Sequence, residues 1–182
     1  LLWHMPRRRL GAEEVRDAML SVSGSLNTEM GGRSVILPVD DAFVDLLYDP
    51  TQWVVSADSS DLNRRSVYLI AKRNLRLPFM EVFDQPDLLT TCARRGTSTH
   101  VPQSLELLNG ATSNELADVF AERLVNDAGS SASAQVRLAY QLATGREPSA
   151  RELKTASAFL ETQPLREFAL AIFNTNAFLY VN

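Results

Sequence analysis

The sequence predicts a mostly α-helical protein, in which an irregular N-terminal half packs against antiparallel helices of the C-terminal half. Two observations predict this class. From residue 102 onward, apolar residues recur at helical spacing between short turns that carry helix-capping residues. Between residues 25 and 63, by contrast, Gly, Pro, Ser and Asp are frequent and no period is sustained. The 182 residues, 45% of them apolar, suffice for a sizeable core, and we expect residues 1–182 to form a single domain.

The first predicted helix covers residues 11–23, where apolar residues recur every three or four positions. Gly24 follows at the position of a C-cap glycine. Arg9 and Glu13 have the spacing of an ion pair on the outer face of this helix. In the irregular segment that follows, we expect one short helix in "DDAFVDLLY" (40–48) and an extended piece in "QWVVS" (52–56).

The segment after residue 63 fits two structures. Val67–Ile70 can form a strand, but the apolar residues around it also fit one face of a helix. We expect a helix over Arg64–Leu75. A second, short helix is predicted over Pro78–Phe83, because proline suits the first position of a helix.

The second half is predicted to be a series of antiparallel helices joined by short turns. Capping boxes, in which a hydroxyl is followed three residues later by Glu, are predicted at Thr112/Glu115 and Ser149/Glu152. Gly145 should end the helix that lies between them. The remaining predicted elements are a short helix over Pro102–Asn109, closed by Gly110, and a last helix that begins near Pro164.

Charge and composition limit the partners that the chain can have. A net charge of −4 argues against nucleic acid, because phosphate binding needs a basic face. No apolar run approaches the ~20 residues of a membrane-spanning helix. The single cysteine precludes an internal disulfide bond. The chain begins Leu1-Leu2-Trp3 instead of Met, and we expect it to be the C-terminal part of a larger multidomain protein.

The stretch "TTCARRGTSTHVPQSLELLNG" (90–110) is the strongest candidate for a functional site. It contains the only cysteine, two adjacent arginines and one of the two histidines. The basic residues between 64 and 76 and the acids of "FDQPD" (83–87) form a second polar group. We assign no catalytic residue and no metal ligand. The candidate ligand-binding or structural polar cluster comprises Arg64, Arg65, Lys72, Arg73, Asp84, Asp87, Cys92, Arg94, Arg95, His100, Gln103 and Asn109.

Three kinds of chemistry have candidate residues in the chain: a reactive thiol, a metal site and a pair of catalytic carboxylates. Cys92 has basic neighbours that would lower a thiol pKa, but a lone cysteine is more often a small buried apolar residue, which we expect here. Cys92, His100 and His4 are too few ligands for a tight transition-metal site. Asp84 and Asp87 could serve as paired carboxylates in glycoside hydrolysis, yet acids at such positions commonly bond turn amides.

We expect the stretch 90–110 to be a buried or half-buried polar junction between the irregular first half and the helical second half. Arg94 and Arg95 would hold the fold there, against Asp84 or Asp87, because guanidinium groups supply five donors in a rigid fork. The alternative, that the same residues line a ligand cleft, stays open. The basic residues after position 63 are expected to pair with Glu81, Asp84 and Asp87, with anion binding as the alternative.

Six segments occur in this order along the chain: "RRRLGAEEVRDAMLSVSG", "GG", "NRRSVYLIAKRNLRLPFMEVFDQPD", "CARRGTSTHVPQSLELLNG", "YQLATGREPSARELKTASAFL" and "NTNAFLYVN". Through these segments the chain resembles a known family. The resemblance extends over Leu1–Asn182 and is to the C-terminal domain of unknown function of planctomycete cytochrome-c-associated proteins, the "PSD" domain family. It implies an exported, multidomain parent protein in which haem c is attached to an N-terminal region. This chain has no C-x-x-C-H motif, so we expect no haem or other cofactor in it.

Two functions remain after these observations. The first is a non-catalytic accessory or interaction domain, which docks neighbouring domains of the parent protein, a partner or a polysaccharide. The second is a catalytic domain that acts on complex polysaccharide, with the polar stretch 90–110 as its active site. Whether the chain is an enzyme is left open, with the sequence favouring the first function because it lacks a recognisable catalytic constellation.

Overall fold

The computed structural model describes residues 6–181 and is mostly α-helical, which confirms the predicted class. Strands β1 (Arg8–Arg9) and β2 (Tyr180–Val181) pair antiparallel and bring the two ends of the chain together. The α-helices are α1 (Ala12–Ser23), α2 (Asp41–Val44), α3 (Pro78–Val82), α4 (Val101–Asn109), α5 (Ala111–Ala128), α6 (Ala132–Thr144), α7 (Ala150–Leu160), α8 (Leu165–Phe173) and α9 (Asn176–Leu179). Three 3-10 turns are η1 (Pro50–Gln52), η2 (Asp61–Asn63) and η3 (Ser66–Tyr68).

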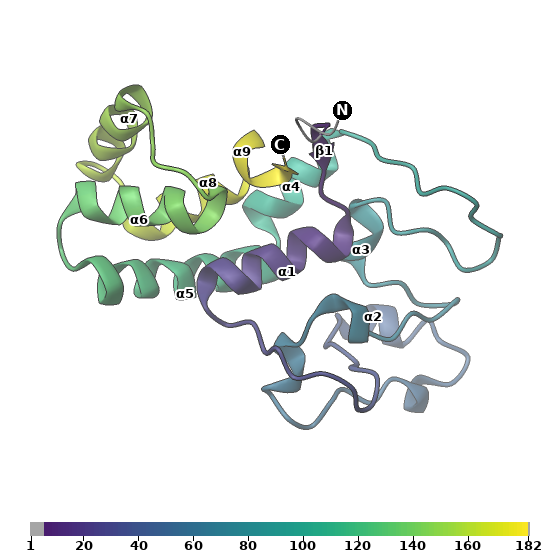
Figure 1. Ribbon diagram of the computed structural model, residues 1–182. Coiled ribbons are helices and arrows are strands. Elements are labelled where there is room, and N and C mark those ends of the chain that lie inside the picture. Colours follow the sequence, from purple (N-terminus) through teal and green to yellow (C-terminus); the bar gives the residue numbers. More distant parts are fainter. Residues whose placement is uncertain (1–5, 182) are drawn as a thin grey trace.

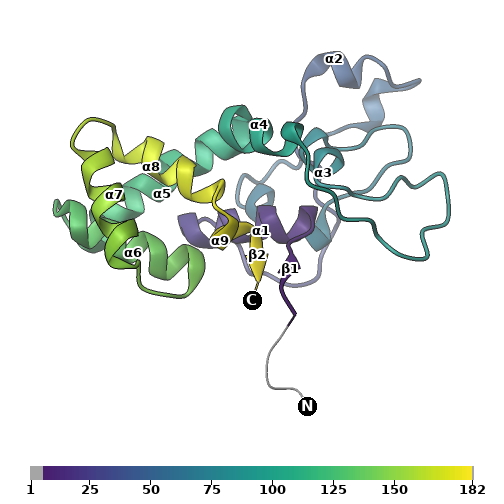
Figure 2. The ribbon, with the colours of Figure 1, turned by 90° about the horizontal axis from the view of Figure 1, so that it is seen from above.

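The helices and the irregular segments occupy different sides of the molecule (Figures 1 and 2). Helices α5 to α9 lie together on one side, and α1 packs along α5. The irregular residues 25–75, which include the short α2, lie on the other side of α1. We call residues 85–97 the arm. In both views the arm extends away from the helices as a long loop.

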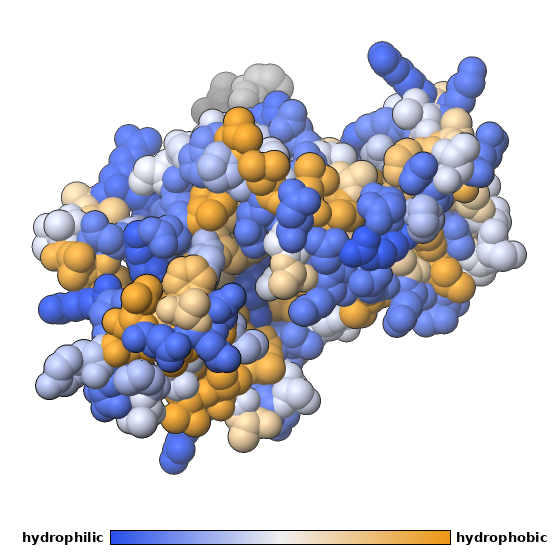
Figure 3. Space-filling view, turned by 180° about the vertical axis from the view of Figure 1, so that it is seen from behind, coloured by the Kyte–Doolittle hydropathy of each residue, from blue (hydrophilic) through white to orange (hydrophobic). Residues whose placement is uncertain are grey.

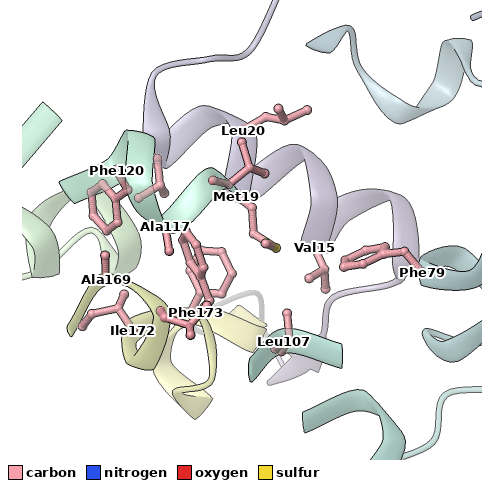
Figure 4. Close-up of a cluster of buried hydrophobic side chains, with 14 of the residues drawn as sticks. Val15, Met19, Leu20, Phe79, Leu107, Ala117, Phe120, Ala169, Ile172 and Phe173 are labelled. Atoms are coloured by element: carbon pink, nitrogen blue, oxygen red, sulfur yellow. The ribbon is translucent and has the colours of Figure 1, made fainter. Parts of the chain in front are cut away.

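The core forms where α1, α4, α5 and α8 meet (Figure 4). Met19 of α1 and Phe120 of α5 are fully buried there. The ring of Phe173 stacks on Phe120 at 5.9 Å between centroids and contacts Phe178 at 5.3 Å. Phe79 of α3 extends this core toward the irregular half. Burial of these apolar side chains is the main favourable contribution to folding.

Most of the predicted helix ends are confirmed. Gly24 and Gly145 both adopt the left-handed conformation, with φ of 82° and 69°, that an αL C-cap requires. At the start of α7, the Ser149 hydroxyl accepts from the amide of Glu152, and the Glu152 carboxylate accepts from the amide of Ser149. Hydrogen bonds from Arg146 contribute most to lowering the pKa of Glu152 to about 2. Pro164 is the N-cap of α8.

The capping box predicted at Thr112 is wrong. Helix α5 begins two residues earlier than this cap implies, at Ala111, and Gly110 is both the C-cap of α4 and the N-cap of α5. A side chain at position 110 would overlap the carbonyl oxygen of Glu106, so this junction requires glycine. The two helices therefore follow each other without the turn in which Thr112 would have been the cap.

The helix predicted over Arg64–Leu75 is also wrong, because distant main-chain partners hold this segment in other conformations. Only the 3-10 turn η3 forms within it. Val35 donates to the carbonyl of Tyr68 at 2.8 Å and accepts from the amide of Ile70 at 2.9 Å. The part of the segment that could have formed a strand thus contributes an isolated parallel bridge, between Val35 and Leu69.

The short elements of the irregular half agree only in part with the sequence. Helix α2 forms inside residues 40–48 but spans four residues, with the Asp40 carboxylate as its N-cap acceptor. Residues 52–56 form no strand, and Ser56 donates its amide to the carbonyl of Ile36 at 3.1 Å. None of the helices in residues 6–181 is both long and apolar enough to cross a membrane.

A first prediction concerns the start of α7. Replacing Ser149 with Ala should lower the free energy of unfolding by about 1 kcal/mol, because the amide of Glu152 loses its acceptor. Denaturant titration measures the change. Ser157→Ala, inside the same helix, is the control and should be neutral or slightly stabilising, because alanine favours helix interiors. Equal effects of the two substitutions would contradict the cap.

Candidate functional site: a groove between α1 and the arm

A groove of about 670 Å³ lies between the N-terminal end of α1, the turn η3 and the arm. Residues Arg8–Gly11, which lead from β1 into α1, form part of its lining. Leu10, Leu69 and Phe83 contribute apolar surface to the lining, and the arm contributes residues between 85 and 97. The groove therefore sits where the ends of the chain, the irregular half and the arm meet.

Two ion pairs form part of the polar wall. The guanidinium of Arg8 donates to both carboxylate oxygens of Glu14, at 2.6 and 2.8 Å. Arg95, from the arm, donates to both carboxylate oxygens of Glu13 at 3.0 and 2.9 Å. Both glutamates belong to the first turn of α1, where negative charge is favoured by the helix dipole. The Arg8–Glu14 pair is about half exposed, whereas in the second pair Arg95 is 59% exposed and Glu13 is 24% exposed.

Below these pairs lies a half-buried network around Asp84 and Gln103. Asp84 accepts from the amide and the hydroxyl of Ser98, both at 2.7 Å, so the two residues tie the ends of the arm together. Gln103 is 1% exposed and donates to Asp84 at 3.3 Å and to the Val82 carbonyl at 3.1 Å. Its side-chain oxygen accepts from Arg9 at 2.6 Å. The network therefore joins α3, the arm, α4 and β1.

The geometry at Asp84 is unusual for a residue with a side chain. Its φ of 63° lies in the left-handed region, which aspartate tolerates better than most residues. Burial acts to raise the pKa of Asp84, but hydrogen bonds from Ser98, the charge of His100 and the amide of Gln103 outweigh it and lower the pKa. The hydrogen bonds with Arg8 do most to lower the pKa of Glu14. Both carboxylates are therefore ionised at neutral pH.

The structure brings only part of the predicted polar cluster to this groove. Asp84, Arg95 and Gln103 line it. The expected pairing of Arg94 and Arg95 with Asp84 or Asp87 is wrong, because the partner of Arg95 is Glu13. Arg94 is exposed, and Asp87 accepts from the amides of Leu89 and Thr90 within the arm.

Other members of the 90–110 stretch lie outside the network. Cys92 is exposed on the arm, which contradicts the buried position expected for it. His100 is exposed and is the N-cap residue of α4. Asn109 donates to the carbonyl of Leu105 in its own helix and does not tie loops together. The stretch is thus a junction at Ser98 and Gln103, and an exposed loop from Thr91 to Thr97.

The basic residues that follow position 63 do not share a helix face. Arg65 pairs with Asp17 of α1 at 3.5 Å, and Lys72 donates to the carbonyl of Gln52 at 2.5 Å. Arg73 is exposed. The expected pairing of this group with nearby acids holds for Arg76, which pairs with Glu81. Arg64 is buried and bonds main-chain carbonyls.

The candidate cluster predicted from the sequence did not include four residues that line the groove: Arg8, Arg9, Glu13 and Glu14. The expected Arg9–Glu13 pair is replaced by Arg8–Glu14 and Arg95–Glu13. The run of arginines at 7–9, directly before two glutamates in the first turn of a helix, was the available signal. Within residues 6–181 no group of three or more His, Cys, Asp and Glu side chains could hold a metal ion. His4 lies outside the described residues.

A second prediction follows from the buried amide of Gln103. Replacing Gln103 with Leu should lower the free energy of unfolding by about 1–3 kcal/mol, because Arg9 and the Val82 carbonyl lose partners in a partly buried place. Asn109→Ala, at the exposed end of the same helix, is the control and should cost less than about 0.5 kcal/mol. Thermal or denaturant unfolding compares them, and a smaller loss for Gln103→Leu would contradict the network.

A third prediction concerns Arg95. Arg95→Ala should lower the free energy of unfolding by no more than about 1 kcal/mol, because exposed ion pairs contribute little to stability. The measurement is again unfolding in denaturant, with Glu13→Gln as the matched removal of the other partner. A loss of several kcal/mol would show that Arg95 holds the fold, which the exposed geometry argues against.

Comparison with known proteins places the chain in one family. The model of the family described as "PSD1: Protein of unknown function (DUF1553)" matches residues 1–160, from the N-terminus to the end of α7. No curated protein and no solved structure matches the chain significantly. The match covers most of the chain, so the chain belongs to the PSD1 family.

Proposed function

We propose that this member of the PSD1 family is a non-catalytic interaction domain that holds its partner in the groove between α1 and the arm. The observation that carries the proposal is the wall of the groove, where exposed guanidinium and carboxylate groups neutralise each other in pairs. Such pairs add little to the stability of the fold. Their guanidinium groups offer hydrogen-bond donors, and their carboxylates offer acceptors, to a partner that replaces one member of a pair.

The state of the acids supports binding over catalysis. A general acid needs a pKa raised toward neutrality, whereas the pKa values of Asp84 and Glu14 are lowered. Burial raises the pKa of Glu106, but this residue is not among those that line the groove. Cys92 and His100 are both exposed, and neither lines the groove.

A protein partner is favoured over a polysaccharide by the character of the lining. Phe83 is the aromatic residue of the groove, and it is 3% exposed, so no open ring face is offered to a sugar. A second surface supports protein contact as well. Apolar side chains are exposed on the irregular half among hydrophilic ones, as Figure 3 shows from behind. Tyr48, Met30 and Leu46 are the most exposed of these, and such surfaces commonly mark protein contacts.

The wider setting rests on the family resemblance and belongs to the same proposal. We propose that the domain is the C-terminal part of an exported, multidomain protein, and that haem c is attached to another region of that protein. The neighbouring domains are then natural partners for the exposed apolar surface. The rival function, catalysis on complex polysaccharide, is supported by the three carboxylates Glu13, Glu14 and Asp84 that line one groove.

A fourth prediction separates these functions. The chain is mixed with the remainder of its parent protein, produced separately, and with neutral and sulfated polysaccharides. We expect saturable association, measured by calorimetry, and no shortening of any polysaccharide. Arg95→Ala should weaken the association about tenfold, as expected for an arginine in a contact surface, while the variant stays folded. Arg137→Ala, which removes an exposed ion pair on α6, is the control and should bind normally.

Release of oligosaccharides by the unaltered chain would contradict the binding function and establish the catalytic one. Association that Arg95→Ala leaves unchanged would place the contact surface outside the groove.

A further inference from the structure

The outer edge of β1 is unpaired. Leu10 donates its amide to the carbonyl of Leu179 at 2.9 Å, and Arg9 lies opposite Tyr180. Hydrogen-bonded and non-hydrogen-bonded pairs alternate in an antiparallel ladder, so Arg9 and Tyr180 form a non-hydrogen-bonded pair. The amide and the carbonyl of Arg9 therefore point away from β2. Within residues 6–181, neither group has a hydrogen-bond partner.

This strand edge belongs to the groove. Four consecutive residues, Arg8–Gly11, line the groove, so β1 and its continuation form part of the wall. An unpaired strand edge is a template for another extended chain, which can add to it through main-chain hydrogen bonds. The apolar part of the lining, with Val67, Leu69 and Leu88, lies in the same groove and can receive alternate side chains of such a chain.

The charges of the groove also suit a peptide. Three arginines of the lining face three acids: Arg8, Arg9 and Arg95 against Glu13, Glu14 and Asp84. The sum is neutral, so the groove has no bias toward a strongly anionic polymer such as a sulfated polysaccharide. Carbonyl oxygens and amides of a peptide can use both the donors and the acceptors of the wall.

We propose that the groove binds an extended peptide segment of a partner protein, which adds to the free edge of β1 as a third strand. This inference rests on the binding function proposed above and names its partner class. The main chain of Arg9 supplies the donor and acceptor that register the peptide. The ion pairs of the wall and the apolar lining select its side chains.

A fifth prediction tests the strand addition without any substitution. Linear peptides that bind the chain are selected from a random peptide library, and amide hydrogen exchange is followed by NMR. The Arg9 amide should exchange quickly in the free chain and become at least about tenfold slower with a selected peptide, because it gains a hydrogen bond. The Leu10 amide, already bonded to Leu179, is the internal control and should be protected in both states.

Two variants isolate the main-chain donor. Arg9→Ala removes the side chain alone, whereas Arg9→Pro removes the outward-pointing amide as well. Proline is compatible with an edge position that donates no ladder bond. Arg9→Pro should bind the selected peptides about tenfold more weakly than Arg9→Ala, the loss expected for one hydrogen bond.

The outcomes distinguish this inference from the function on which it rests. If no peptide binds, if the Arg9 amide stays unprotected, or if the two variants bind equally, strand addition is wrong. An oligosaccharide that binds without being cleaved, and that slows amide hydrogen exchange around the groove, would contradict a peptide partner but support the binding function. Its cleavage would overturn both.

Discussion

The buried guanidinium of Arg16 joins the two halves of the molecule, and the position of the segment 62–66 beside α1 depends on it. Arg16 is on α1, whose apolar face packs in the core against α5, and it is 4% exposed. It donates to the carbonyls of Leu62 and Arg64 at 2.5 and 3.0 Å and to the hydroxyl of Ser66 at 3.1 Å. Burial lowers the pKa of Arg16, yet an arginine stays charged in proteins, so its donors need oxygen partners. These hydrogen bonds therefore fix the position of the main chain from 62 to 66 next to α1.

Arg64 bonds main-chain carbonyls in the same way as Arg16 does. Its guanidinium donates to the carbonyls of Glu29 and Gly31 and stacks on the ring of Tyr68 at 4.2 Å. Loop carbonyls that no helix or sheet could satisfy thus find donors on a side chain. This explains how a segment with so little regular structure packs against α1. It also places η3, and with it one side of the groove, relative to α1.

The parts of the fold that the sequence predicted are those decided by neighbouring residues. Gly24, Gly145 and the pair Ser149/Glu152 specify helix ends through contacts within a few residues. The segment 64–75 was mispredicted because its local pattern suits a helix, while residues 27–35, far away in the sequence, supply its actual partners. A junction was expected over the whole stretch 90–110, but only Ser98 and Gln103 form one. Arg95 instead pairs with Glu13, 82 positions away, and no spacing rule reveals such a pair. Arg16 looked like any polar residue of an amphipathic helix.

Burial divides the arginines of this chain into two kinds with opposite consequences. Arg16 and Arg64 are buried and bonded to the main chain, so the removal of either would leave several carbonyls without donors inside the protein. Arg8 and Arg95 are exposed and paired with carboxylates of one helix turn, where solvent already weakens the pairing. A partner in the groove can therefore replace those pairs at small cost, while the buried arginines keep η3 and α1 in place. Buried hydrogen bonds therefore hold the fold, and the exposed ion pairs of the groove wall are the groups that the proposed partner would replace.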